Sequence, residues 1–486
     1  MAEKPAVVST VENTIERPLC VDLDGTLVKS DTLLDSALLL ARKQTRQALR
    51  APLWLKGGRA AFKAEVTSRV SLDVEHLPWN HKLLEYLAEQ RAAGRKIYLT
   101  TGADTRLAQR IADYLGLFDG VVASNGATNQ TGHNKLASLQ ARFGEQGFDY
   151  IGNAGPDVPL LAASGEAMVA NPTRSLHSKL ASRNVKVIRS FEDRAPLGRS
   201  LLRAIRLHQW AKNVLIFVPV LLAHKLQLIR LGDAVLAFFC FSLCASATYV
   251  VNDLLDVDAD RRHPRKRNRP FAAGDLPVAS GAAIILLFLA AGLAGAALLP
   301  RKFLLWLLVY VVTTLAYSLR LKRMVLVDVL ILSGLYTVRL LAGAAATRVA
   351  ISPWFAAFAV FLFLSLAIVK RFSELENIRA RGVTPANDRG YLLTDIEQLR
   401  SFGTMCGLGA VVIFALYING PDIVKLYRHP ARMWLIMPLL ILWIFRVWLL
   451  ASRGQLDEDP VIFAVTDRMS LLIGAAIAVI AALAAI

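Results

Sequence analysis

The sequence predicts a two-part protein, with an N-terminal α/β domain followed by an all-α polytopic membrane domain of about nine transmembrane helices. Two observations predict this division. The chain has 486 residues, too many for one ordinary domain, and its apolar residues, 55% of the total, are segregated. Apolar runs are short up to about residue 195, whereas after about 213 they approach the roughly 20 residues that cross a bilayer core.

Three segments are expected along the chain. They are a cytosolic α/β domain over 1–195, an amphipathic interfacial linker helix over 196–213, and a transmembrane domain over 214–486. The linker carries arginines on one side and Trp210 near its end, which favours a position on the membrane face. The nine candidate spans are about 213–229, 232–251, 278–299, 302–318, 325–346, 353–370, 403–420, 431–450 and 468–486.

Charge asymmetry orients these spans. The loops after the second, fourth, sixth and eighth hold 16 lysines and arginines, and the opposite loops hold 7. The positive-inside rule therefore places the first set in the cytosol, with the protein in the cytoplasmic (inner) membrane. Met1–Leu19 carries charges and lacks an apolar core, so no secretory signal is expected and the N-terminal domain should stay cytosolic.

Net charge and cysteine content exclude other classes of protein. The net charge of +18 fits the cytosolic cations of a membrane protein, and no basic face accompanies a nucleic-acid-binding fold, so no nucleic-acid partner is expected. The four cysteines have no CxxC spacing and are expected to be reduced, buried residues without a metal or redox role. Association into a homo-oligomer is left open.

Four apolar stretches of the N-terminal part read as strands that end in polar residues. The first precedes Asp22 and Asp24, and "KIYLTTG" ends in Thr100 and Thr101. "FDGVVASNG" precedes Lys135, and "FDYIGNAGPD" reaches Asp157. Strands that alternate with helical stretches predict a parallel sheet with a site at the carboxyl ends of its strands.

The DxDGT motif at residues 22–26 resembles the signature of the haloacid dehalogenase (HAD) superfamily of phosphatases, over about residues 17–190. The resemblance implies a Rossmann-like fold in which Asp22 is the nucleophile and Asp24 the general acid/base. It further implies that Thr101 and Lys135 hold the phosphoryl group, and that Asp22, Asp24 and Asp157 bind Mg²⁺.

One position departs from that pattern. The family's GDxxxD motif reads Gly152-Asn153-x-x-x-Asp157 here, so one formal charge is missing. The domain could accordingly be a degenerate one with a structural role. P-type ATPases also join such a domain to membrane helices, but their DKTGT signature and their inserted domain are absent from this sequence.

The end of the second candidate span is rich in charge. Asn252, Asp256 and Asp260 are spaced i, i+4, i+8, with Asp253 one step aside, so a continuing helix would place them on one face. Clustered carboxylates at membrane depth are costly and suit Mg²⁺ that carries substrate phosphates. A solvated loop would explain the arginines but not the acidic spacing. The basic residues 263–269 then indicate a substrate with several phosphates, such as a diphosphate.

NDxxDxxxD after the second of nine spans resembles the UbiA-type intramembrane prenyltransferase superfamily, over about residues 198–486. That implies a ring of helices around a polar cavity. A second acidic DxxxD motif is missing, because Leu332 stands where the second aspartate of a motif beginning at Asp328 would be. The chain instead looks like the decaprenyl-phosphate phosphoribosyltransferase branch, in the stretches "LRLHQWAKNVLIFVP", "NDLLDVDADRRHPRKRNRPFAAG", "YSLRLKR", "KRFSEL" and "DPVIFAVTDR".

This resemblance implies transfer of phosphoribosyl from phosphoribosyl diphosphate to a polyprenyl phosphate, with Mg²⁺ on Asn252, Asp253, Asp256 and Asp260. Asp253 and Asp256 would be central to catalysis. Seven basic residues would share the phosphates, with Asn213 and Tyr317 as hydrogen-bonding partners: Lys212, Lys266, Arg269, Lys322, Arg339, Lys370 and Arg371. Arg339 lies inside the fifth span, where an arginine needs a partner. For Lys370 and Arg371, positive-inside anchoring is the competing interpretation.

The N-terminal domain would then remove the 5′-phosphate of the lipid product. Two alternatives stay open. One is a prenyltransferase that uses an isoprenyl diphosphate donor on an aromatic or quinone precursor. The other is a transporter with a regulatory soluble domain, which predicts no Mg²⁺-dependent turnover.

Overall fold

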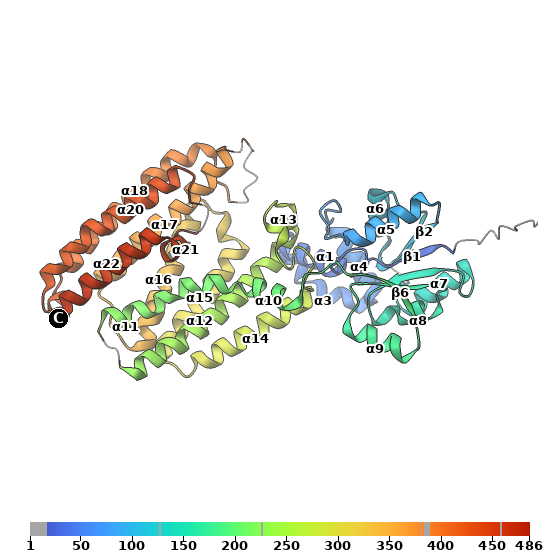
Figure 1. Ribbon diagram of the computed structural model, residues 1–486, viewed down its shortest axis with the longest axis horizontal. Helices are drawn as coiled ribbons and strands as arrows, with labels where there is room; N and C mark the ends of the chain where they lie inside the picture. Colours follow the sequence, from blue (N-terminus) through green and yellow to red (C-terminus); the bar gives the residue numbers. More distant parts are fainter. Residues whose placement is uncertain (1–16, 126–127, 225–226, 381, 383–388, 457–458) are drawn as a thin grey trace, which may run out of the picture. The chain divides into compact units, whose positions relative to one another are not determined.

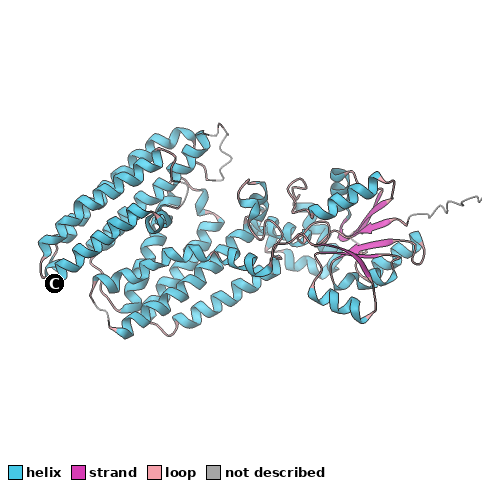
Figure 2. Cartoon of the chain, viewed as in Figure 1, coloured by secondary structure: helices cyan, strands magenta, loops and turns pink. Residues whose placement is uncertain are grey.

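The computed structural model of the chain describes residues 17–125, 128–224, 227–380, 382, 389–456 and 459–486. The chain divides into two compact units, Met1–Ala204 with Asp253–Gly281, and Ile205–Asn252 with Ala282–Ile486. The predicted fold class is confirmed: the first unit contains a parallel α/β sheet, and the second is helical (Figures 1 and 2).

Six parallel strands form the sheet of the first unit, in the order β3-β2-β1-β4-β5-β6. In the central strand, Cys20 lies opposite Tyr98 on one side and Tyr150 on the other. The chain order reverses between β1 and β4, which is where open α/β sheets place their sites. The strands are β1 (Leu19–Val21), β2 (Ile97–Asp104), β3 (Gly120–Ser124), β4 (Asp149–Gly152), β5 (Ala167–Ala170) and β6 (Val187–Phe191).

Side chains of the sheet alternate between two apolar cores. Leu19 and Val21 belong to one buried cluster, whereas Cys20 between them belongs to the other. Helices cover both clusters, so the sheet is buried on both faces. These helices are α1 (Thr32–Lys43), α2 (Thr45–Ala48), α3 (Ala51–Trp54), α4 (Gly58–Arg69), α5 (His81–Ala92), α6 (Thr105–Leu115), α7 (His133–Phe143), α8 (Val158–Ala163) and α9 (Arg174–Ser182).

The acidic segment after the second span does not continue as one straight helix. Helix α12 (Leu228–Leu255) ends before Asp256, whose ψ of 3° departs from helical geometry, and α13 (Val257–Arg262) begins after it. The expected single helical face for Asn252, Asp256 and Asp260 is therefore wrong. Residues 253–281 fold into the same compact unit as the sheet.

Eight helical stretches among the described residues are long and apolar enough to cross a membrane, so this is a multi-pass membrane protein. They match eight of the nine expected spans. Their bounds are Leu228–Leu255 (α12), Val278–Ala296 (α14), Arg301–Leu319 (α15), Val327–Thr347 (α16), Pro353–Ala380 (α17), Leu393–Ile418 (which contains α18, Ile396–Ile418), Pro430–Ser452 (which contains α20, Ile436–Ser452) and Arg468–Ala485 (α22).

The first expected span, 213–229, is not one long helix in the part of the chain that is described. A 3₁₀ segment, Leu207–Phe217, leads into the five-residue helix α11 (Val218–Leu222). The apolar run is too short because His224 and Lys225 follow it, and Pro219 removes a backbone donor. The linker helix is likewise shorter than expected: α10 covers Leu197–Ile205 and is followed by Arg206 at φ 53°.

Candidate functional site

The carboxyl end of β1 presents Asp22 to a buried lysine. Lys135 on α7 donates from Nζ to Asp22 Oδ1 at 2.7 Å, and the Thr26 hydroxyl donates to Asp22 Oδ2 at 3.3 Å. Burial raises the pKa of the Asp22 carboxyl, and the Lys135 ammonium opposes that rise. An aspartate oxygen beside an ammonium group is a suitable pair for a phosphoryl acceptor and its counter-charge.

Asp24 is held by the N-terminus of a helix. The backbone N–H of Thr32, in the first turn of α1, donates to Asp24 Oδ1 at 2.7 Å. Burial, reinforced by the Asp31 carboxylate, raises the pKa of Asp24 to about 7. A carboxyl group that exchanges its proton near neutral pH is suited to general acid/base work.

Asp157 organises the loop after β4. Its Oδ2 accepts the backbone N–H groups of Asn153 and Ala154 at 3.1 Å each, and its Oδ1 accepts the Tyr150 hydroxyl at 3.0 Å. The Asn153 amide packs against Gly25, where a Cβ would lie 1.9 Å from Nδ2. Gly25 also has a φ of +78°, so both its conformation and the close contact require glycine.

The two phosphate-contacting residues predicted beside these carboxylates occupy different positions. Lys135 lies among Asp22, Tyr150 and Asp157, with 3.7 Å between its Nζ and Asp157 Oδ1. Thr101 is fully buried within β2, which continues to Asp104, and its hydroxyl accepts the N–H of Ala103 at 3.0 Å. Tyr150, which donates to Asp157 and accepts from Lys135, was not predicted, because its only sequence signal is its place inside a strand.

A cavity of about 590 Å³ adjoins this group. It shares Leu33 and Lys63 with a smaller cavity that contains Asp24. Leu55 and Phe62, from the helical segment after the DxDGT motif, give it apolar walls, and Lys63 is anchored to Gly102 and Asn129. The cavity has room for the leaving group of a phosphorylated substrate, which is the part that separates from the phosphoryl group.

The carboxylates of this unit fit a hard divalent cation. Asp22 and Asp24 offer oxygen ligands at one sheet edge, which is the donor type that Mg²⁺ takes. Asp157 fits a supporting role better, because backbone N–H groups already bind its Oδ2.

Two of the acidic residues after the second span converge on one cation. Arg269 Nη1 lies 3.0 Å from Asp253 Oδ1 and 2.7 Å from Asp260 Oδ2, and both carboxylates are buried. The residues can therefore surround a single positive charge, as a Mg²⁺ site requires. Asp256 has a separate partner, Arg42 of α1, at 3.6 Å. Sequence reasoning missed Arg42, which lies 214 positions before Asp256 in the chain.

A second polar group lies inside the helical unit and centres on Asp459. Lys212 and Lys370 both donate to Asp459 Oδ2 at 2.8 Å, and the Tyr336 hydroxyl donates to Oδ1 at 2.8 Å. Two ammonium groups share one carboxylate, which leaves one surplus positive charge. Asp459 was part of a stretch singled out in the sequence, but its role as a shared anion could not be inferred without the fold.

Arg339 has the partners that its place inside a span requires. It donates to Asn213 Oδ1 at 2.8 Å, to the Leu335 carbonyl at 2.6 Å and to the Tyr310 hydroxyl at 3.1 Å. Asn252, in the same unit, accepts from Lys322 Nζ at 3.4 Å. The structure thus brings Arg339 together with Asn213, and Lys322 with Asn252.

Arg371 is engaged by acidic neighbours. Its Nε donates to Asp328 Oδ2 at 2.6 Å, and it also pairs with Glu374. Asp328 is fully buried and accepts the Tyr391 hydroxyl as well, while the Tyr317 hydroxyl lies 3.4 Å from Arg371 Nη2. Lys266, the remaining predicted cation, is in a short 3₁₀ turn, Lys266–Asn268.

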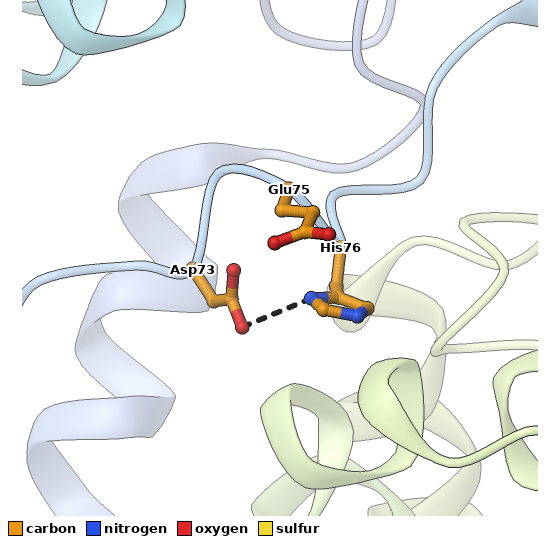
Figure 3. Close-up of side chains that lie close together, drawn as sticks. All are labelled: Asp73, Glu75 and His76. Atoms are coloured by element: carbon orange, nitrogen blue, oxygen red, sulfur yellow. Dashed lines mark hydrogen bonds and ion pairs between the residues drawn. The ribbon is translucent and has the colours of Figure 1, made fainter. Parts of the chain in front are cut away.

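A further acidic cluster, Asp73, Glu75 and His76, lies in the first unit (Figure 3). Asp73 Oδ2 is 3.0 Å from His76 Nδ1, and the Arg262 guanidinium is 3.6 Å from the same carboxylate. The cluster therefore has a cationic partner within the protein.

Comparison with known proteins identifies the helical part. The UbiA prenyltransferase family matches residues 213–472. The chain belongs to this family. As a UbiA-family membrane transferase, it is 38% identical to the Sinorhizobium fredii protein y4nM over 470 residues, which cover 95% of this chain and 90% of the relative.

Two further comparisons give partial matches. The decaprenyl-phosphate phosphoribosyltransferase of Mycobacterium tuberculosis is 34% identical over 229 residues, covering 46% of this chain and 75% of the relative. A UbiA homolog from Archaeoglobus fulgidus, in a structure bound to DMAPP and Mg²⁺, is 20% identical with a TM-score of 0.46, covering 59% of this chain and 98% of that one.

Proposed function

We propose that this protein transfers 5-phosphoribosyl from phosphoribosyl diphosphate to a polyprenyl phosphate, and that its N-terminal domain removes the 5′-phosphate of the product. The observation that carries the proposal is the 34% identity, over 229 residues, to decaprenyl-phosphate phosphoribosyltransferase. The surplus positive charge around Asp459 and the carboxylates after the second span are the groups that such substrates need.

In the transfer step, an oxygen of the lipid phosphate forms a bond to C1 of the ribose, and the bond from C1 to the diphosphate oxygen breaks. The acceptor is already an anion, so no strong general base is needed. Asn252, Asp253, Asp256 and Asp260 would hold Mg²⁺, which neutralises the departing diphosphate. The cations of the helical unit, Lys212 and Lys370 foremost, would orient the remaining phosphates.

In the phosphatase step, Asp22 attacks the phosphorus of the 5′-phosphate and the bond from phosphorus to the ribose oxygen breaks. Asp24 donates a proton to that oxygen, which its raised pKa allows. Water then hydrolyses the aspartyl phosphate while Asp24 takes a proton from it. Lys135 offsets the charge on the phosphoryl oxygens, and the cavity lined by Leu55 and Phe62 would take the lipid-linked leaving group.

We place the N-terminal domain on the cytosolic side, where phosphoribosyl diphosphate would be supplied, because the positive-inside asymmetry of the loops favours that orientation. Covalent linkage would raise the effective concentration of the phosphatase site near the transferase product.

The experiment supplies purified full-length protein in nanodiscs with phosphoribosyl diphosphate, Mg²⁺ and decaprenyl phosphate, followed by mass spectrometry of the lipids. We expect a phosphoribosyl lipid that loses its phosphate with time. Asp22→Asn should stop that loss without stopping transfer. Asp256→Asn should lower transfer by about a hundredfold or more, whereas Asp258→Asn, which changes an acidic residue between two motif positions, should not.

A prenyltransferase that uses an isoprenyl diphosphate is the second candidate, favoured by the family match itself. One observation speaks against this candidate. Asp328 is the one acidic residue present where the second DxxxD motif would be, and it is fully buried and paired with Arg371 and Tyr391. Alkylation of a hydroxybenzoate by an isoprenyl diphosphate, with no consumption of phosphoribosyl diphosphate, would replace our proposal by this one.

A further inference from the structure

Helix α1 of the N-terminal domain contacts both catalytic motifs. Its first turn supplies the Thr32 N–H that binds Asp24 at 2.7 Å. Its last turn supplies Arg42, whose Nη1 lies 3.6 Å from Asp256 Oδ1. Twelve helical residues span about 18 Å at 1.5 Å per residue, so one rigid element reaches from the phosphatase aspartate to the transferase motif.

The first turn of α1 and the residues just before it bind the segment that carries the transferase motif. Arg261, five residues after Asp256, lies 2.8 Å from Asp35 Oδ2 and donates to Ser30 Oγ at 3.0 Å. Both charged side chains are almost completely buried. Arg261 also donates to the Ala272 carbonyl at 3.1 Å, which fixes the segment against itself. The position of Arg42 beside Asp256 is therefore built into the fold of this unit.

We propose that Arg42 is a diphosphate-binding residue of the transferase, contributed by the N-terminal domain. The inference rests on the proposed function, in which Asp256 holds the Mg²⁺ of the donor diphosphate. A guanidinium beside that carboxylate lies where anionic oxygens of the donor would gather. Its planar fork of donors suits phosphate oxygens better than an ammonium group does.

Arg42 and Asp256 form an ion pair, with 3.6 Å between Arg42 Nη1 and Asp256 Oδ1. Arg42 and Asp256 are each partly accessible, with side-chain exposures of 14% and 16%, so a ligand can reach them.

The test measures binding of inorganic diphosphate to the full-length protein by isothermal titration calorimetry with Mg²⁺ present. Arg42→Gln should weaken diphosphate binding by about tenfold or more, the loss expected for one hydrogen bond to a charged group. Arg42→Lys should give an intermediate affinity, because it keeps the charge and loses the fork. Lys43→Gln, at the neighbouring exposed position of the same turn, should bind as the wild type does.

Mg²⁺ titrated alone separates the two roles of Arg42. If it only neutralises Asp256, Arg42→Gln should leave diphosphate affinity unchanged while Mg²⁺ binds as well or better, and that result would overturn the proposal. Hydrogen exchange gives a second readout: diphosphate with Mg²⁺ should slow exchange of the α1 amides in the wild type and not in Arg42→Gln. If Arg42→Gln fails to fold, the role of Arg42 is decided by Arg42→Lys, through its diphosphate affinity and the same hydrogen-exchange measurement.

The outcome also distinguishes failure of this inference from failure of the proposed function. If the wild-type protein binds no Mg²⁺–diphosphate and consumes no phosphoribosyl diphosphate, both the role of Arg42 and the proposed function are wrong. A wild type that consumes the donor, together with an Arg42→Gln variant of unchanged diphosphate affinity, would remove only the role of Arg42.

Discussion

Asp24 shows how one residue's surroundings set its chemistry. Burial and the Asp31 carboxylate both disfavour the charged form of Asp24 and raise its pKa to about 7, although the Thr32 N–H acts in the opposite direction. The folded-state pKa therefore lies above the value of about 4 for an unfolded aspartate. In metal-free protein this group contributes stability at low pH that is lost as the pH rises from about 4 through 7.

Mg²⁺ should favour the ionised form of Asp22, whose pKa burial raises to about 6, because the cation and the proton compete for that carboxylate. We expect the apparent Mg²⁺ affinity of the N-terminal site to rise by about tenfold or more between pH 5.5 and pH 8. The measurement is the Mg²⁺-induced shift in melting temperature at each pH. The double variant Asp22→Asn/Asp24→Asn is the control, since it keeps the transferase carboxylates. Equal shifts at both pH values in the wild type would contradict the assignment.

Gly25 gives a second test at the same scale. Gly25→Ala should destabilise the N-terminal unit by about 2–4 kcal/mol, from the left-handed backbone and from the contact with Asn153. Gly94→Ala is the matched control, because Gly94 has a similar φ of +88° but nothing within 4 Å of its Cβ. It should cost only about 1–2 kcal/mol. Chemical denaturation followed by limited proteolysis measures both, and equal losses would show that the Asn153 contact does not matter.

Several secondary-structure elements could be predicted from the sequence because their signals are local. Strands β1–β4 are apolar runs that end in polar residues, and eight of the nine expected spans are long apolar runs. Strand β6 has no such signal, since four of its five residues are at least partly exposed. The break of α12 at Asp256 and the pairing of Arg42 with that residue depend on tertiary contacts, which no local pattern encodes.

Asp459 joins four elements of the helical unit through one carboxylate. It accepts the N–H of Val461 as the N-cap of α21 (Pro460–Thr466), and it binds Lys212 of the 3₁₀ segment, Tyr336 of α16 and Lys370 of α17. Removing its charge would leave two ammonium groups close together without an anion.

Asp459→Asn should therefore destabilise the helical unit, by about 3–5 kcal/mol. Adding Lys370→Met should recover part of that loss, because it removes one of the two uncompensated charges. The measurement is the melting temperature of the detergent-solubilised protein by size-exclusion chromatography, arranged as a double-mutant cycle. Strictly additive losses would show that Lys370 and Asp459 do not interact.

On the scale of the whole molecule, the N-terminal unit is completed by residues from a distant part of the chain. The segment 253–281 runs from the end of α12 to the start of α14, yet it folds with the sheet domain. Arg261 and Asp35 are 226 positions apart and form a buried ion pair there. Composition alone indicated a domain over 1–195, because a contact between residues so far apart in the chain produces no local sequence pattern.

The energetics of this pair predict a characteristic pattern. Arg261→Met should destabilise the N-terminal unit by about 3–5 kcal/mol, because it leaves the Asp35 carboxylate buried and unpaired, and Asp35→Leu should do the same to Arg261. The double variant should be close to the wild type, since replacing both charges by apolar groups removes the desolvation cost as well as the attraction. Proteolysis of the N-terminal unit in the full-length protein, as a function of denaturant, measures all three. If the double variant lost the sum of the two single losses, the pair would not be the contact through which the segment after α12 supports the sheet domain.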